Sequence, residues 1–156
     1  ILPLLYLRLR DSADWLRLPG DVRQSLSTAF QDAATRALLQ EAALTGLTAA
    51  LMAAGVRVAL LKGAATGRTV YGSPAERPIS DFDLLVPRAE VDAARAVLLD
   101  LGFRGHNLTQ RGRLGEKLRA YRAELPFIGT GPQYAGLLVE LHWALLEMPY
   151  YIHRIR

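Results

Sequence analysis

Ile79-Ser-Asp-Phe-Asp-Leu-Leu-Val86 is an apolar segment that carries two aspartates two positions apart. Successive side chains of a β-strand point to opposite faces, so Asp81 and Asp83 share one face of the predicted strand. The other face carries mainly apolar side chains such as Phe82 and Leu84, which are typical of a protein core. The segment therefore predicts a half-buried strand with two carboxylates about 7 Å apart along its polar face.

The two aspartates favour a metal site. Like charges this close repel each other, and removing either one from water is costly. A divalent cation relieves both costs, and oxygen ligands on a strand suit Mg²⁺ or Mn²⁺, with phosphate oxygens and water completing the coordination. A solvated edge strand would also accommodate Asp81 and Asp83, but the apolar residues on either side argue against that alternative.

A second alternating segment, Leu138-Val-Glu-Leu-His-Trp143, places Glu140 and His142 on one face. If this strand lies beside the first one in the same sheet, Glu140 becomes a third carboxylate of the site. Three carboxylates can hold two metal ions about 3.5–4 Å apart, and the third also offers a general base. The alternative for Glu140 is a surface ion pair. For His142, a structural hydrogen bond to the backbone or to a carboxylate is favoured over a role as a metal ligand.

Candidate phosphate-binding residues lie upstream of the aspartates. Lys62 and Gly63 follow a short apolar run and precede a predicted helix, where backbone N–H groups favour phosphate. Gly63 allows close approach, and Lys62 offers a point charge to a triphosphate. The second glycine and the Lys-Ser/Thr pair of a P-loop are absent, and an ordinary turn would use the same residues. Arg77 is a candidate for holding phosphate or the carboxylates, or is a loop arginine in water.

The remaining elements follow from apolar spacing. Residues 21–54 predict one long helix or two joined helices ending at Gly55, with Gln40 as the one polar break in the apolar series. Strands are predicted at 56–61, 79–86, 103–108, 120–128 and 137–143, and helices at 64–71 and 90–101. Helices first, then strands with helices between them, predict an α+β or mixed α/β domain.

Composition narrows the class of protein. The chain has 156 residues, of which 51% are hydrophobic and 22% charged, as in a soluble globular domain. It has no cysteine, which excludes disulfides, zinc–thiolate sites and thiol nucleophiles and fits a cytoplasmic location. A net charge of +4 favours anionic partners, nucleoside triphosphates as well as nucleic acids. No apolar run is long enough to span a bilayer, so no membrane partner is expected.

The chain is expected to divide into three parts. Residues 1–54 form an N-terminal helical segment that packs on a catalytic core of residues 55–148, and residues 149–156 begin a truncated C-terminal region. The apolar residues 1–7 and 150–152 would be unusual if exposed. They are expected to pack on further chain or on a partner, which includes a homo-oligomer.

Three motifs follow one another along the chain: Leu61-Lys-Gly-Ala-Ala65, then Arg77-Pro-Ile-Ser-Asp-Phe-Asp-Leu-Leu-Val-Pro87, then Val139-Glu-Leu-His-Trp143. Together with Tyr71 they resemble the uncharacterised bacterial nucleotidyltransferase family of the DNA polymerase β-like superfamily, over about residues 56–146.

The resemblance implies a small mixed sheet flanked by helices, with the Asp-x-Asp strand near its middle. It implies nucleotide binding at Lys62 and Gly63, magnesium held by Asp81 and Asp83, and Glu140 as the third acidic residue. The implied reaction moves a nucleoside monophosphate from a nucleoside triphosphate to an acceptor hydroxyl and releases pyrophosphate. Most members of the superfamily have Gly-Ser at the turn where this chain has Lys62 and Gly63. The contacts to the donor triphosphate are therefore left open.

Three other readings compete. A metal-dependent glycosyltransferase also uses Asp-x-Asp, to hold a nucleotide-sugar, but its motif follows a βαβ region, whereas this chain is helical there. A phosphatase with an Asp-x-Asp nucleophile normally has Thr or Val where this chain has Leu85. A degenerate domain would bind a nucleotide without turnover, and the three carboxylates argue against it. The acceptor (a small molecule, sugar, RNA or protein hydroxyl) and the nucleobase stay open.

Overall fold

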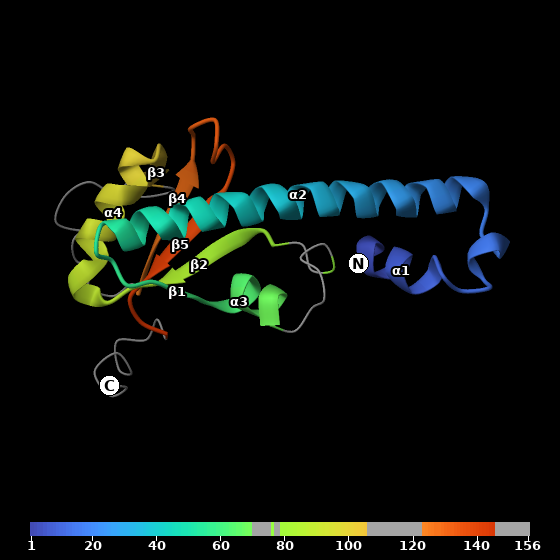
Figure 1. The fold of residues 1–156 in the computed structure, drawn as a ribbon, viewed down its shortest axis with the longest axis horizontal. Helices are drawn as coiled ribbons and strands as arrows, with labels where there is room; N and C mark the ends of the chain where they lie inside the picture. Colours follow the sequence, from blue (N-terminus) through green and yellow to red (C-terminus); the bar gives the residue numbers. More distant parts are fainter. Residues whose placement is uncertain (70–75, 77–78, 106–122, 146–156) are drawn as a thin grey trace.

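A computed structural model describes residues 1–69, 76, 79–105 and 123–145 (Figure 1). The helices are α1 (Leu2–Leu9), α2 (Gly20–Ala53), α3 (Lys62–Thr69) and α4 (Val91–Asp100), with 3₁₀ turns η1 (Trp15–Arg17) and η3 (Arg88–Glu90). The strands are β1 (Ala59–Leu60), β2 (Asp81–Leu85), β3 (Phe103–Gly105), β4 (Glu124–Gly129) and β5 (Leu138–His142). This arrangement confirms the predicted mixed α+β fold.

The five strands form one mixed sheet in the order β1-β2-β5-β4-β3. β2 and β5 run parallel, and the other neighbouring strands are antiparallel. The strand that carries the two aspartates therefore lies next to the central strand β5, which carries Glu140. The adjacency on which a third carboxylate depends is present.

Helices α2 and α4 contribute to the core that the sheet forms on one of its faces. The apolar side chains of β2 and β5 that alternate with the polar ones are buried there, as the strand period requires. The largest fully buried side chains are Leu47 and Leu51 of α2, Leu98 of α4, Phe82 and Leu84 of β2, Phe103 of β3, Phe127 of β4, and Val139 and Leu141 of β5, together with Val56 and Val86.

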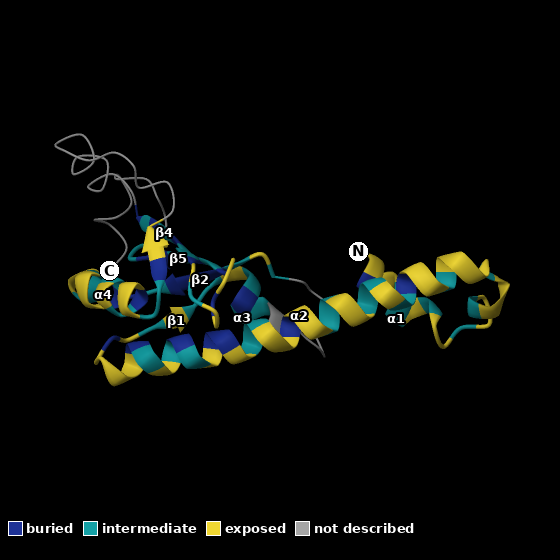
Figure 2. Ribbon diagram, turned by 90° about the horizontal axis from the view of Figure 1, so that it is seen from above, coloured by how far each residue is buried: buried dark blue, intermediate teal, exposed yellow. Residues whose placement is uncertain are grey.

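The long helix α2 has two different halves. Its buried residues are concentrated toward its C-terminal end, beside the sheet, whereas the N-terminal half extends beyond the sheet and packs against α1 (Figure 2). Tyr6 of α1 stacks on Phe30 of α2, with 4.8 Å between the ring centroids. The helix predicted over residues 21–54 is thus one continuous helix, and Gly55 follows it with a φ of 77°. Helix α1 lies within the helical segment predicted over residues 1–54, although its own bounds were not predicted.

The first strand is shorter than its apolar sequence indicated. Residues 56–61 predict six residues of strand, but only Ala59 and Leu60 pair, with the end of β2. The backbone N–H of Arg57 donates to a carboxylate oxygen of Glu90 at 2.8 Å, so a side chain takes the place of a strand partner there.

Several predictions lie outside the described residues. These are Arg77, the loop around it, residues 106–108 and 120–122 of two predicted strands, and the C-terminal region 149–156. Within the part of the chain that the structure describes, no helix combines the length and apolar character needed to cross a bilayer.

Candidate metal and nucleotide site

The sheet register places the candidate residues in three rows on the face opposite the α2 core. Residues paired across neighbouring strands have side chains on the same face. The rows are Asp81, Leu138 and Ile128; Asp83, Glu140 and Pro126; and Leu85, His142 and Glu124. We call this the site face. It brings carboxylates from three strands together, including Glu124, which the sequence analysis did not identify.

Asp83 is the centre of the site. It is only 2% exposed, although its side chain is acidic. Its Oδ1 accepts a hydrogen bond from Nζ of Lys62 at 2.7 Å and lies 2.9 Å from Nε2 of His142. A buried carboxylate is costly unless it is paired and hydrogen-bonded, and these two partners supply that pairing.

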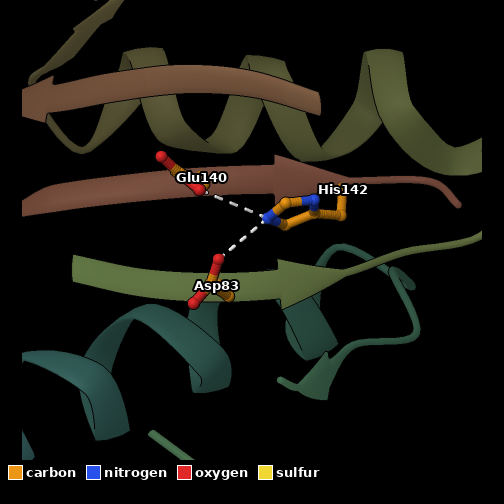
Figure 3. Close-up of side chains that lie close together, drawn as sticks. All are labelled: Asp83, Glu140 and His142. Carbon is orange, nitrogen blue, oxygen red and sulfur yellow. Dashed lines mark hydrogen bonds and ion pairs between the residues drawn. The ribbon is translucent and has the colours of Figure 1, made fainter. Parts of the chain in front are cut away.

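His142 belongs to the third row, but its ring reaches back to the second. Its Nε2 lies 2.9 Å from Oδ1 of Asp83 and 3.5 Å from Oε2 of Glu140 (Figure 3). Its Nδ1 lies 3.5 Å from a carboxylate oxygen of Glu124. The predicted contact between this histidine and a carboxylate is therefore present, and the imidazole stands between carboxylates of three strands.

Asp81 is set apart from this group. It is half-buried, and its Oδ1 accepts a hydrogen bond from the hydroxyl of Ser80 at 2.7 Å. It is paired with Leu138 in the register, one row away from Glu140. Strand rise and strand spacing place the Cα atoms of Asp81 and Glu140 about 8 Å apart. Asp81 does not belong to the group of possible ligand atoms that lie within 4.8 Å of one another, which comes from Asp83, Glu140 and His142.

Lys62 has an unusual backbone. Its φ is 44°, in the left-handed region that favours glycine. The N–H of Leu61 donates to the carbonyl oxygen of Asp83 at 2.9 Å, which ties this turn to β2. The hydrogen bond with Asp83 raises the pKa of the Lys62 ammonium, and the nearby charge of Glu140 adds to the effect. The lysine is therefore held as a cation beside Asp83.

Gly63 is not required by crowding. A Cβ at this position would meet only Cγ2 of Ile79, at 3.7 Å, which is an ordinary contact. The residue that adopts the glycine-like backbone is Lys62 instead.

Gln40 also acts at this site and was noted in the sequence only as a polar break in the apolar series of α2. Its Nε2 donates to the carbonyl oxygen of Ile79 at 2.9 Å, two residues before Asp81. The long helix thereby fixes the start of the strand that carries both aspartates. A polar residue within an apolar helical stripe was the available signal.

The residues present suit a divalent cation. Asp83, Glu140 and His142 each offer a ligand atom, and these atoms lie within 4.8 Å of one another. The ammonium of Lys62 already lies against Asp83 and 3.7 Å from Oε2 of Glu140, so a positive charge is accepted between these two carboxylates. The carboxylate oxygens fit Mg²⁺ or Mn²⁺, whereas an imidazole nitrogen is more typical of transition metals than of Mg²⁺.

A mixed sheet that presents carboxylates from two adjacent parallel strands, with a lysine at the start of α3, is the arrangement that the resemblance to nucleotidyltransferases implied. The chain belongs to a family described as uncharacterised nucleotidyltransferases, whose model matches residues 1–154. This membership confirms the family resemblance of the three sequence motifs. Among curated proteins and among solved structures, no significant match to the chain was found.

Proposed function

We propose that this protein transfers a nucleoside monophosphate from a nucleoside triphosphate to an acceptor hydroxyl. The observation that carries the proposal is the register of β2 and β5, in which Asp83 and Glu140 are direct neighbours on the site face. Lys62 lies beside both carboxylates, at the position where the triphosphate is expected. Family membership supports the same class of reaction.

In this proposal Asp81, Asp83 and Glu140 hold Mg²⁺ or Mn²⁺, and His142 is close enough to contribute a nitrogen ligand. Such ions, when bound, neutralise charge on the triphosphate and on the attacking and leaving oxygens. The hydroxyl of Ser80 orients the Asp81 carboxylate by donating a hydrogen bond to its Oδ1. Burial of Asp83 keeps its carboxylate in one orientation before the donor arrives.

The donor triphosphate is held by the turn between β1 and α3. Gly63 contributes no side chain to the first turn of α3, and backbone N–H groups at a helix start attract phosphate. Lys62 adds a full positive charge. Arg77, which lies outside the described residues, is proposed as a further phosphate contact.

The reaction balances as a single displacement. The acceptor oxygen forms a bond to the α-phosphorus, and the bond from that phosphorus to the oxygen bridging to the β-phosphorus breaks. Pyrophosphate leaves with the electron pair of the broken bond. The proton of the acceptor hydroxyl goes to a carboxylate, for which Glu140 is the proposed base.

The test compares Asp83→Asn with Asp92→Asn, a matched change at an exposed position of α4. Each protein is incubated with each of the four ribonucleoside triphosphates and Mn²⁺ or Mg²⁺, and nucleotide binding is measured by calorimetry beside pyrophosphate release. The proposal expects metal-dependent binding and pyrophosphate release in the wild type and in Asp92→Asn, and neither in Asp83→Asn.

Other outcomes separate the alternatives. Release of a nucleoside diphosphate from a sugar nucleotide would replace the proposal with a glycosyltransferase. Metal-dependent nucleotide binding without any product, even with a panel of hydroxyl-bearing acceptors, would indicate a binding module. If Asp83→Asn matched the wild type in pyrophosphate release, the site assignment would be wrong.

A further inference from the structure

The ammonium group of Lys62 lies in the space where a bound cation would be shared by two carboxylates. Its Nζ is 2.7 Å from Oδ1 of Asp83 and 3.7 Å from Oε2 of Glu140. Nε2 of His142 approaches the same two carboxylate oxygens, at 2.9 Å and 3.5 Å. A metal ion bound by these three residues would compete with the lysine for the same oxygen atoms.

The lysine is anchored differently at its two ends. Its backbone is fixed by the hydrogen bond between Leu61 and Asp83 and by the Thr66 hydroxyl, which donates to the Lys62 carbonyl oxygen at 2.7 Å. Its side chain is 61% exposed, whereas that of Asp83 is 3% exposed. The ammonium can therefore leave the carboxylates by rotating its flexible stem through solvent, without any movement of the strand.

We propose that Lys62 is an exchangeable cation, which occupies the carboxylates of Asp83 and Glu140 in the resting protein and moves onto the phosphates when metal and triphosphate arrive together. This inference rests on the proposed function, because it takes the same residues as the donor site. The additional claim is that the Lys62 ammonium contacts the carboxylates first and the phosphates afterwards.

The exchange has a thermodynamic consequence. A metal ion that arrives alone must displace the ammonium, which then has no anion to pair with. The apparent affinity of the site for the metal ion is therefore reduced. A metal ion that brings a triphosphate supplies that anion. Binding of metal and of triphosphate is therefore positively coupled through Lys62, and the coupling is equal in both directions.

The experiment uses the full chain and two probes, Mn²⁺ alone and a preformed complex of manganese with inorganic tripolyphosphate. Binding is measured by calorimetry for the wild type, Lys62→Gly and Lys62→Met. Glycine suits the left-handed backbone at this position, so Lys62→Gly removes the ammonium with little risk to folding. Arg104→Met is the matched control, because it removes one positive charge from an exposed position of β3, two strands away from β5.

We expect both Lys62 variants to bind Mn²⁺ alone about tenfold more tightly than the wild type, since the competing charged hydrogen bond is gone. Arg104→Met should stay within about twofold of the wild type, because its charge acts through solvent. For the manganese–tripolyphosphate complex the advantage should disappear or reverse. Adding Asp83→Asn to Lys62→Gly should abolish the gain, which places the binding at this site.

Each contrary result has a distinct meaning. Equal Mn²⁺ affinity in the wild type and the Lys62 variants would overturn the exchange and leave the proposed function standing. An advantage that persists with tripolyphosphate would overturn the movement onto phosphate. Absence of Mn²⁺ binding in every variant, with either probe, would overturn the exchange and the proposed donor site together.

Discussion

The left-handed backbone of Lys62 leads to a stability prediction with an unusual sign. Replacing an ordinary helical residue by glycine destabilises a protein. At position 62, however, glycine should be better tolerated than methionine, whose side chain is similar in length to that of lysine. Lys62→Gly and Lys62→Met both remove the ammonium and its contact with Asp83. The difference between the two variants therefore isolates the conformational free energy of the backbone at φ 44°.

The magnitude follows from two opposing effects. A left-handed conformation costs a residue with a Cβ about 1–2 kcal/mol, and glycine avoids this cost. Glycine is also more flexible in the unfolded chain, which costs about 0.5–1 kcal/mol. Lys62→Gly should therefore be more stable than Lys62→Met by about 0.5–1 kcal/mol, which for a chain of this size corresponds to roughly 1–4 °C in Tm.

Urea unfolding followed by circular dichroism gives the free energy of unfolding of each variant without metal or nucleotide. The control pair is Ala96→Gly and Ala96→Met, at an exposed position within α4. There the order should reverse, with glycine worse than methionine by about 0.8 kcal/mol. If Lys62→Met were as stable as Lys62→Gly, the lysine would not be held in the left-handed conformation, and the argument from its backbone would fail.

Three further predictions concern contacts that fix the strands or the segments beside them. Gln40→Leu should lower the free energy of unfolding by about 1 kcal/mol in urea titrations, because the carbonyl oxygen at the start of β2 loses its donor. Gly129→Ala should lower the free energy of unfolding by more than about 3 kcal/mol, because the new Cβ would lie 2.7 Å from the carbonyl carbon and 2.8 Å from the Cβ of the buried Tyr134. The control Gly131→Ala, whose Cβ would lie 3.5 Å from its nearest neighbour, should be tolerated in the same assay. Hydrogen bonds from Arg57 lower the pKa of Glu90 below its ordinary value of 4.5, so the stabilisation is present above that pH and is lost as the pH falls through the folded-state pKa. Thermal melts of Glu90→Gln should therefore show a smaller loss of Tm on acidification than the wild type, and an unchanged loss would show that the pair is not formed.

Alternation along two short segments was sufficient to predict which face of each strand carries its carboxylates. In the segments around Asp83 and Glu140 every second residue is apolar, and a strand that buries one face leaves only one orientation for the carboxylates. The long helix α2 was equally predictable, because its apolar residues recur at helical spacing up to Gly55. These are local patterns, and each reports on a single element.

Contacts between elements were not predictable in the same way. The left-handed backbone of Lys62 depends on the tie between Leu61 and β2, and a lysine carries no sequence signal for such a conformation. The bond from Gln40 to Ile79 joins residues 39 positions apart. Likewise, Glu124 reaches the site only because β4 pairs with β5 in one particular register, which its own sequence does not specify.

The charge of the whole chain and the charge of its site have opposite signs. The net charge of +4 suggests an affinity for anions, yet the site face presents Asp81, Asp83, Glu124 and Glu140 within three adjacent rows. Lys62 contacts two of these carboxylates, Asp83 and Glu140, with His142 beside it. A triphosphate approaching these carboxylates alone would be repelled, because like charges at close range disfavour one another. Under the proposed function, attraction of the donor therefore depends on the cations held at the site and not on the overall basicity of the chain.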